Sequence, residues 1–186
     1  HTNETIQAVS EELAPKFAEL SDGIYLNDKL FERIKTLYNK RESLDLDSES
    51  LKLLEEYYDN FLIAGANLSA EDKATLKEYN ARLAVLTNQF GKTLLAANNE
   101  GAVVFTDKNE LAGVSEDVLK SREQEDGKGW KIPLQNTTQQ PLLQSMEDRD
   151  SRNKLFNAAW NRADGGANST NDIVKELVML RAKKAE

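Results

Sequence analysis

The sequence contains no cysteine and a single histidine, His1. Without cysteine, the chain forms no disulfide and offers neither a thiol nucleophile nor a thiolate ligand for a metal. A zinc site within it would need almost only carboxylate ligands, which suit zinc poorly. Neither a Ser-His-Asp nor a Cys-His catalytic arrangement can be assembled. We therefore predict no catalytic residue and no metal ligand in this chain, and no pattern identifies substrate-binding residues.

Positive charge is also scarce. The chain has 24 Lys and Arg against 32 Asp and Glu, a net charge of −8, and its basic residues form no cluster. Because nucleic-acid binding depends on Lys and Arg displacing counterions from phosphates, we predict no nucleic-acid partner. No apolar run approaches the ~18 to 20 residues of a membrane span, so we expect no membrane partner either.

The composition that remains is typical of a mainly α fold. Charged residues make up 30% and hydrophobic residues 39% of the chain, and Leu, Ala, Glu and Lys dominate over β-branched residues. The longest periodic segment, residues 69–99, predicts one scaffold helix of about 45 Å. Ser69 is its expected N-cap, with Asp72 in the first turn. The apolar stripe of this helix comprises Leu76, Tyr79, Leu83, Leu86, Phe90 and Leu94.

An amphipathic helix is also predicted at the start of the chain. Pro15 lies inside it and predicts a kink or a break, because proline removes one backbone hydrogen bond and clashes with the preceding turn. Ser21, Asp22 and Gly23 predict the end of this helix. The apolar stripe comprises Ile6, Val9, Leu13, Phe17 and Leu20.

Two more amphipathic helices are predicted before the scaffold helix. Asn27 caps the first, which runs to about Arg41. Asp47 or Ser48 caps the second, which ends near Gly65, a residue suited to the left-handed conformation of a helix C-terminus. The short connections favour antiparallel neighbours in a multi-helix bundle.

After Gly101 the pattern changes to a small β-hairpin excursion. Residues 102–106 and 130–134 are β-favouring runs, and Ser115 caps a short helix through Arg122 between them. A two-stranded ribbon is only marginally stable alone, so we expect it to pack on helices. The chain then returns to helix at Gln140, with Pro141 in the first turn. Two further helices are expected, one around Asp148 to Arg162 and one that begins near Ile173 and runs to Glu186. The predicted sub-regions are therefore 1–100 (antiparallel helices), 101–135 (strand and loop) and 136–186 (helices).

Residues 45–56 resemble a calcium-binding loop only weakly. Asp45, Asp47, Glu49 and Glu56 occupy positions one, three, five and twelve of an EF-hand pattern. Ser50 stands where the loop needs glycine for its sharp turn, and the following residues already have a helical pattern. We favour a capped, solvated helix start.

Other polar and aromatic groups have an ordinary structural interpretation that we favour. Acidic neighbours could in principle perform acid and base chemistry, but nothing indicates their burial, and a solvated surface is favoured: Glu55, Glu56, Glu123, Glu125 and Asp126. Four Asn-x-Ser/Thr sequons are explained by chance and would matter only in a secretory context: Asn3, Asn67, Asn136 and Asn168. Five aromatic residues could line a groove, but core packing is favoured: Tyr25, Tyr57, Tyr58, Tyr79 and Trp160.

Several phrases in the sequence resemble a known enzyme family. They are residues 13–27 (LAPKFAELSDGIYLN), 64–69 (AGANLS), 133–142 (PLQNTTQQPL) and 149–162 (RDSRNKLFNAAWNR), followed by Leu180 and Arg181. Together they resemble the N-terminal half of bacterial peptidyl-dipeptidases, which belong with oligopeptidase A and thimet oligopeptidase among the zinc metallopeptidases. The similarity covers essentially the whole chain, and none of the phrases is a catalytic motif.

The resemblance implies a large helical enzyme that admits short peptides to a channel between two halves. In such enzymes zinc is held by a His-Glu-x-x-His helix and a downstream Glu, and the metal activates water for peptide hydrolysis. This sequence contains no such motif, so no family ligand can be assigned to any residue here. The resemblance therefore implies that the chain is an inactive part of the helical N-terminal region, forming one wall of the channel next to the missing catalytic half. Dipeptide release and internal cleavage both remain open.

An alternative is a free-standing helical interaction module without proteolytic activity. The reading frame beyond Glu186 discriminates the two, because only the peptidase requires a downstream His-Glu-x-x-His motif. The resemblance favours a cytoplasmic location, with exported forms as the alternative, and any leader would lie upstream of His1.

Overall fold

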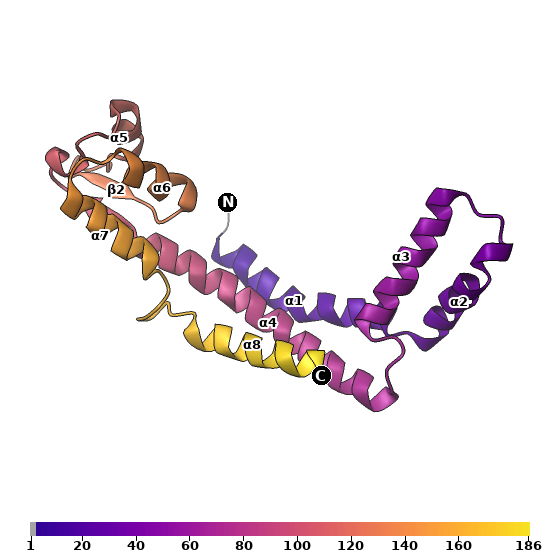
Figure 1. The fold of residues 1–186 in the computed structure, drawn as a ribbon. Coiled ribbons are helices and arrows are strands. Elements are labelled where there is room, and N and C mark those ends of the chain that lie inside the picture. Colours follow the sequence, from indigo (N-terminus) through magenta and orange to yellow (C-terminus); the bar gives the residue numbers. More distant parts are fainter. Residues whose placement is uncertain (1–2) are drawn as a thin grey trace. The chain divides into compact units, whose positions relative to one another are not determined.

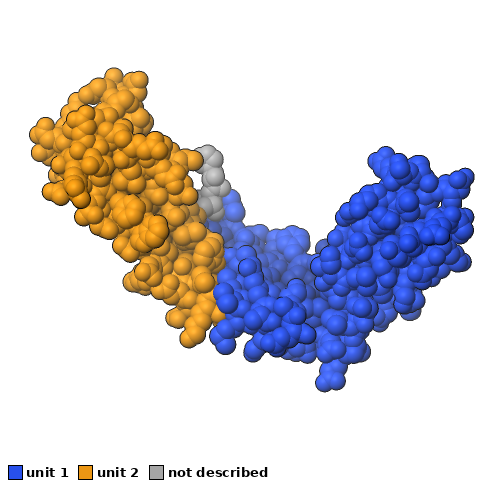
Figure 2. All heavy atoms as spheres, viewed as in Figure 1, with its two compact units in different colours: residues 1–88, 177–186 blue, residues 89–176 orange. Residues whose placement is uncertain are grey.

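A computed structural model describes residues 3–186. Within these residues, eight α-helices are joined by short loops, two 3-10 helices and one two-stranded antiparallel sheet (Figure 1). The predicted mainly α fold with a small β-hairpin is confirmed. The chain divides into two compact units, coloured blue and orange in Figure 2. Unit 1 comprises residues up to 88 together with 177–186, and unit 2 comprises residues 89–176.

Unit 1 is built from capped helices. They are α1 (Glu4–Tyr25), α2 (Asp28–Asn39), α3 (Ser48–Ala64), the first part of α4 (Ala70–Glu100) and the last part of α8 (Asn171–Ala185), with a 3-10 turn at Arg41–Ser43. Side chains of Asn27 and Asp47 accept the backbone N–H groups of Leu30 and Ser50 at 3.0 and 2.7 Å. Gly65 ends α3 with a φ of 97°. The predicted caps and the stop at Gly65 are confirmed.

The long α4 helix also agrees with its prediction. The hydroxyl of Ser69 accepts the N–H of Asp72 at 3.1 Å and donates to the Asp72 carboxylate at 2.7 Å. Every member of the predicted apolar stripe is buried or half-buried. The periodicity therefore identified the packed side of this helix correctly.

The first helix is longer than predicted. It runs without a break through Pro15 and continues past Ser21 and Gly23 to Tyr25, so the predicted break and the predicted end are wrong. Proline lacks one backbone N–H donor, and the helix continues despite this single missing donor at Pro15. Asp22 is buried and hydrogen-bonded to Asn80 of α4, which holds the last turn of α1 in helical form.

An aromatic cluster joins α1, α2 and α3. Phe31 and Phe61 are buried, with exposed fractions of 3% and 2%, and their rings stack at 6.1 Å. Tyr25 lies 5.0 Å from Phe61, and Tyr58 stacks on Phe31 at 5.9 Å. Burial of such rings contributes several kcal/mol in total, on the order of 1.5–3 per side chain. The favoured core role is thus confirmed for Tyr25 and Tyr58.

One ion pair links the N-terminal turns of α2 and α4. The Lys73 side chain is 9% exposed, and its Nζ donates to Oδ1 of Asp28 at 2.5 Å. We expect Asp28→Asn to destabilise the chain by about 1–2 kcal/mol, because it leaves a buried ammonium group without its charged partner. The measurement is urea unfolding followed by circular dichroism. Glu32→Gln is the matched control: its pair with Lys35 is largely exposed, and the expected loss is below about 0.5 kcal/mol. Equal losses would contradict the prediction.

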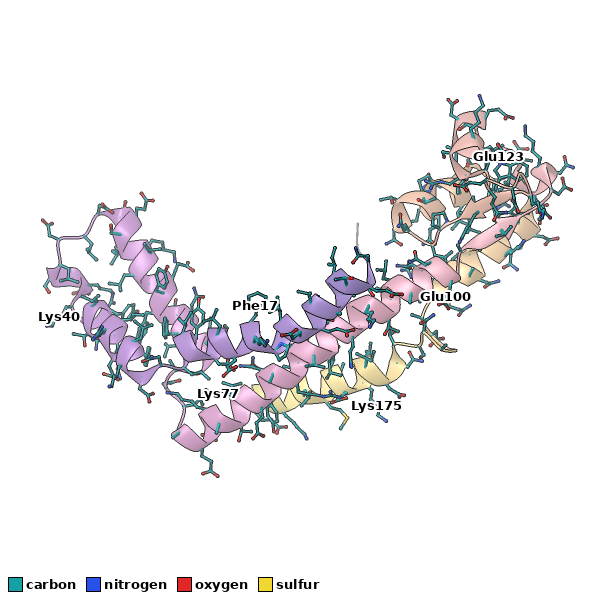
Figure 3. The ribbon with its side chains drawn as sticks, turned by 180° about the vertical axis from the view of Figure 1, so that it is seen from behind. Phe17, Lys40, Lys77, Glu100, Glu123 and Lys175 are labelled. Carbon is teal, nitrogen blue, oxygen red and sulfur yellow. The ribbon has the colours of Figure 1, made fainter. Side chains whose placement is uncertain are left out.

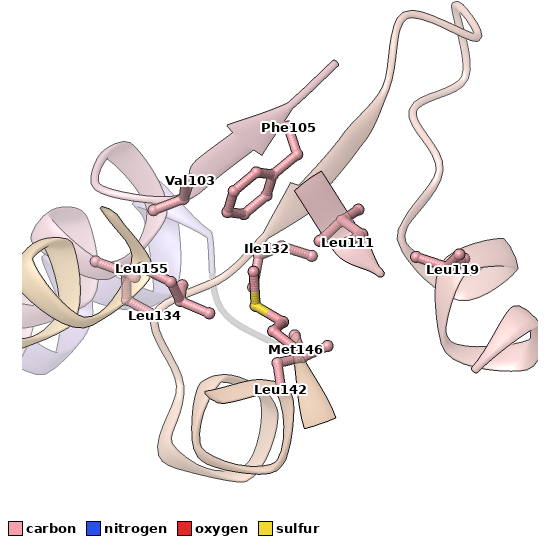
Figure 4. Close-up of a cluster of buried hydrophobic side chains, with 9 residues drawn as sticks. All are labelled: Val103, Phe105, Leu111, Leu119, Ile132, Leu134, Leu142, Met146 and Leu155. Atoms are coloured by element: carbon pink, nitrogen blue, oxygen red, sulfur yellow. The ribbon is translucent and has the colours of Figure 1, made fainter. Parts of the chain in front are cut away.

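Unit 2 is organised around a small sheet. Strand β1 (Val103–Phe105) pairs antiparallel with β2 (Trp130–Ile132), and Phe105 is opposite Trp130. A 3-10 helix (Lys108–Leu111) and α5 (Glu116–Arg122) lie between the strands in sequence, and α6 (Asn136–Ser145) and α7 (Arg149–Trp160) follow. Nine buried side chains form the core (Figure 4): Val103, Phe105, Leu111, Leu119, Ile132, Leu134, Leu142, Met146 and Leu155. The ribbon packs on helices, as expected.

Helix α6 begins earlier than predicted. It starts at Asn136, which places Pro141 in the middle of the helix and not in its first turn. The backbone N–H groups of Thr138 and Gln139 both donate to the Gln135 carbonyl. The first turn of the helix is therefore hydrogen-bonded without the N–H group that Pro141 lacks. The prediction from Pro141 was wrong because only one intrahelical bond is lost there.

The cap of α7 has a pH-dependent consequence. Asp148 Oδ1 accepts the Ser151 N–H at 2.7 Å, and hydrogen bonds from the Ser151 hydroxyl and backbone lower the pKa of the Asp148 carboxyl. A lowered folded-state pKa stabilises the fold above the unfolded pKa, and this contribution is lost as pH falls through the folded pKa. Carboxyl NMR titration is expected to show Asp148 titrating below its ordinary range, and Ser151→Ala is expected to raise the value. No change in that variant would contradict the assignment.

Candidate functional site

Helix α1 presents an apolar face that residues 3–186 leave exposed. We define the α1 face by residues that are between 44% and 64% exposed and recur at helical spacing: Ile6, Val9, Phe17, Leu20 and Ile24. Figure 3 shows Phe17 on this helix. Single exposed apolar residues are ordinary on protein surfaces, but a continuous stripe along one helix indicates an interaction surface.

An open groove lies along this face within unit 1. Its volume is about 1100 Å³, and it is lined by apolar groups of α1 and α4, among them Pro15, Leu20, Ile24 and Ala81. Charged residues of both signs also line it: Lys16, Glu19, Asp22, Lys77 and Glu78. An apolar groove bordered by charges of both signs is suited to packing against another polypeptide segment.

Polar contacts fix α1 while its apolar face stays outward. The Asn80 side chain of α4 donates from Nδ2 to Oδ1 of buried Asp22 at 2.6 Å and accepts from Nζ of Lys184 in α8 at 2.7 Å. Further along the same helices, Asn88 Nδ2 donates to the Ser10 hydroxyl at 2.6 Å. The position of α1 in unit 1 is therefore set by hydrogen bonds on one side of the helix, and no local sequence pattern indicates this network.

The acidic candidates lie on the surface. Asp47 caps α3, as the favoured interpretation of residues 45–56 predicts. Residues 123, 125 and 126 are exposed, as is Glu56, while Glu55 is half-buried. No group of three or more His, Cys, Asp or Glu side chains able to hold a metal occurs among residues 3–186. His1 lies outside the described residues.

The aromatic candidates divide between core and surface. Tyr79 is half-buried on α4, whereas Tyr57 is 50% and Trp160 76% exposed, so the favoured core role is wrong for these last two. Trp160 stacks on Phe156 along α7, with ring centroids 5.7 Å apart, and both rings are exposed. The structure does not bring the five aromatic residues together in one groove.

Comparison with known proteins identifies the relatives of this chain. No family model matches it. It is 46% identical to dipeptidyl carboxypeptidase of Escherichia coli (strain K12) over 100% of its length and 28% of that protein. It is 26% identical to oligopeptidase A of Haemophilus influenzae over 92% of this chain and 27% of that protein. The chain is a homologue of these peptidases.

The similarity to dipeptidyl carboxypeptidase and oligopeptidase A confirms the resemblance inferred from the sequence phrases. The same relationship extends to a probable cytosolic oligopeptidase A of Arabidopsis thaliana, which is 21% identical over 97% of this chain. The chain spans about 28% of the length of the dipeptidyl carboxypeptidases it matches. No helix within residues 3–186 is long and apolar enough to cross a membrane.

Proposed function

We propose that this chain is the helical, non-catalytic part of a zinc-dependent peptidase that hydrolyses short peptides, and that it forms one wall of the substrate channel. The observation that carries the proposal is 46% identity to a dipeptidyl carboxypeptidase across the whole chain. Residues 1–100, 101–135 and 136–186 are proposed as sub-regions of that helical part.

The residues of this chain do not fit a zinc site. No suitable group of ligands occurs in the described part of the chain, and cysteine is absent from the sequence. We therefore propose that the zinc ligands of the complete protein lie outside these 186 residues, and we assign no catalytic step to any residue here.

The α1 face supports a role in assembly of the complete protein. Its five exposed apolar side chains and the adjoining groove of about 1100 Å³ would be stabilised by contact with the remaining polypeptide. In this proposal the catalytic half is the intramolecular partner, and the short peptides that are hydrolysed bind in the complete channel. A cytoplasmic location is proposed by analogy with the relative named as a cytosolic oligopeptidase A.

The test compares this chain with the longer protein that the proposal requires. We expect the purified chain, supplied with zinc, not to cleave a reporter peptide, whereas the complete protein cleaves it and loses activity with a chelator. Turnover by the chain alone that a chelator abolishes would overturn the non-catalytic assignment. A stop codon directly after Glu186 would favour the free-standing interaction module.

A further inference from the structure

Helices α5 and α6 of unit 2 enclose a second pocket with a different chemistry. Its volume is about 330 Å³, at the lower end of the range for small-ligand sites. Its walls include the apolar side chains of Val114, Val118 and Leu142. A pocket of this volume accommodates a ligand about as large as one amino-acid residue with its terminal group.

The only charged side chain that lines this pocket in the described part of the chain is Arg122. Its guanidinium makes no hydrogen bond, ion pair or ring contact with any of residues 3–186, and its Nε is buried without an acceptor. A guanidinium carries five N–H donors in a geometry that matches a carboxylate. Acidic residues outnumber basic residues in this chain, which has a net charge of −8. An arginine in a pocket that no acidic side chain of residues 3–186 lines is therefore unusual for this protein.

Hydroxyl groups provide additional unused hydrogen-bonding capacity. Ser115 precedes α5 but makes no side-chain capping bond. Thr137 and buried Thr138, both in the first turn of α6, also line the pocket, and neither hydroxyl is bonded to another described residue. Polar groups without protein partners beside an apolar wall are the composition of a small-molecule site.

We propose that this pocket binds a small aliphatic carboxylate, such as the C-terminal residue of a peptide, with Arg122 pairing the carboxylate and the apolar wall receiving the side chain. The site is independent of peptide hydrolysis by the complete protein. It needs no metal and no residue outside unit 2.

The experiment is an NMR titration of the full chain with N-acetyl-leucine. Backbone amide signals of Ser115, Val118 and Thr138 are expected to shift saturably, with a dissociation constant on the order of 1 mM for so small a ligand. N-acetyl-leucinamide has the same shape without the charge and is expected to bind about tenfold more weakly, because it cannot form charged hydrogen bonds with Arg122. Equal binding of the two compounds would overturn the assignment, and so would the absence of saturable shifts.

Matched variants test the role of the arginine. Arg122→Gln is expected to weaken binding of N-acetyl-leucine about tenfold, whereas Lys120→Gln, which removes the same charge from an exposed position of α5 outside the pocket, leaves it unchanged. Equal effects of the two variants would show a general charge effect and contradict the site. Because the amide probe changes the ligand and not the protein, it remains decisive if Arg122→Gln perturbs folding.

Inorganic phosphate distinguishes a carboxylate site from a general anion site. It is expected to bind more weakly than N-acetyl-leucine, because it gains nothing from the apolar wall. Binding of phosphate with equal or higher affinity would overturn the assignment of an aliphatic carboxylate.

Discussion

Replacing Phe105 with alanine is expected to destabilise unit 2 by about 3–5 kcal/mol, the range for deleting a fully buried phenylalanine. Phe105 is 0% exposed and lies in the nine-residue core with Ile132 and Leu155. Its ring also lies 4.5 Å below the ammonium group of Lys154. The variant therefore loses apolar burial, leaves a cavity and removes a cation–π contact.

Val104 offers a matched control one residue away. It is 38% exposed and faces the opposite side of β1. Val104→Ala is expected to lower the free energy of unfolding by less than about 1 kcal/mol. Urea unfolding is followed by the fluorescence of Trp130, which packs against the core, in a Trp160→Phe background so that one tryptophan reports. Similar losses of unfolding free energy in the two variants would contradict the assignment of Phe105 to the core of unit 2.

Gly129→Ala is expected to destabilise unit 2 by about 2–6 kcal/mol, through backbone strain together with a steric clash. Gly129 has a φ of +116°, and a Cβ built on it would lie 2.1 Å from the carbonyl oxygen of Phe105. Because that oxygen belongs to the neighbouring strand, relief of the clash requires the two strands to separate. The same urea experiment with Trp130 fluorescence measures the effect.

A substitution at Gly127 separates the effect of backbone strain from the effect of the steric clash. It lies in the same turn with a φ of +68°, and no atom lies within 4 Å of a Cβ at this position. Gly127→Ala is expected to cost about 1 kcal/mol, the penalty of the left-handed conformation alone. If Gly127→Ala proved as costly as Gly129→Ala, close strand approach would not be the cause.

Local signals in the sequence were sufficient for most of the fold. Periodicity located α4 and its buried stripe, and the capping residues Asn27 and Asp47 marked helix starts because each satisfies a backbone N–H group within its own turn. Both strands were predicted from short β-favouring runs. These features depend on neighbours in sequence, so no tertiary information was needed.

Features that depend on distant contacts were not predictable. The helical stripe of α1 indicated an apolar face correctly, but only the structure shows that this face is exposed in the chain. Trp160 was assigned to the core by residue type, although it lies on the outer side of α7. The continuation of α1 depends on Asn80, which is 58 residues from Asp22. The pocket at Arg122 likewise depends on α5 and α6 meeting in space, which no local pattern specifies.

Unit 1 consists of two separate segments of the chain, which has a consequence for biosynthesis. Residues 177–186 belong to unit 1, whereas the 88 consecutive residues before them, 89–176, make up unit 2. The ribosome therefore synthesises all of unit 2 before Lys184, whose ammonium group donates to Asn80. Unit 2 is contiguous and emerges complete before the Lys184–Asn80 contact of unit 1 can form.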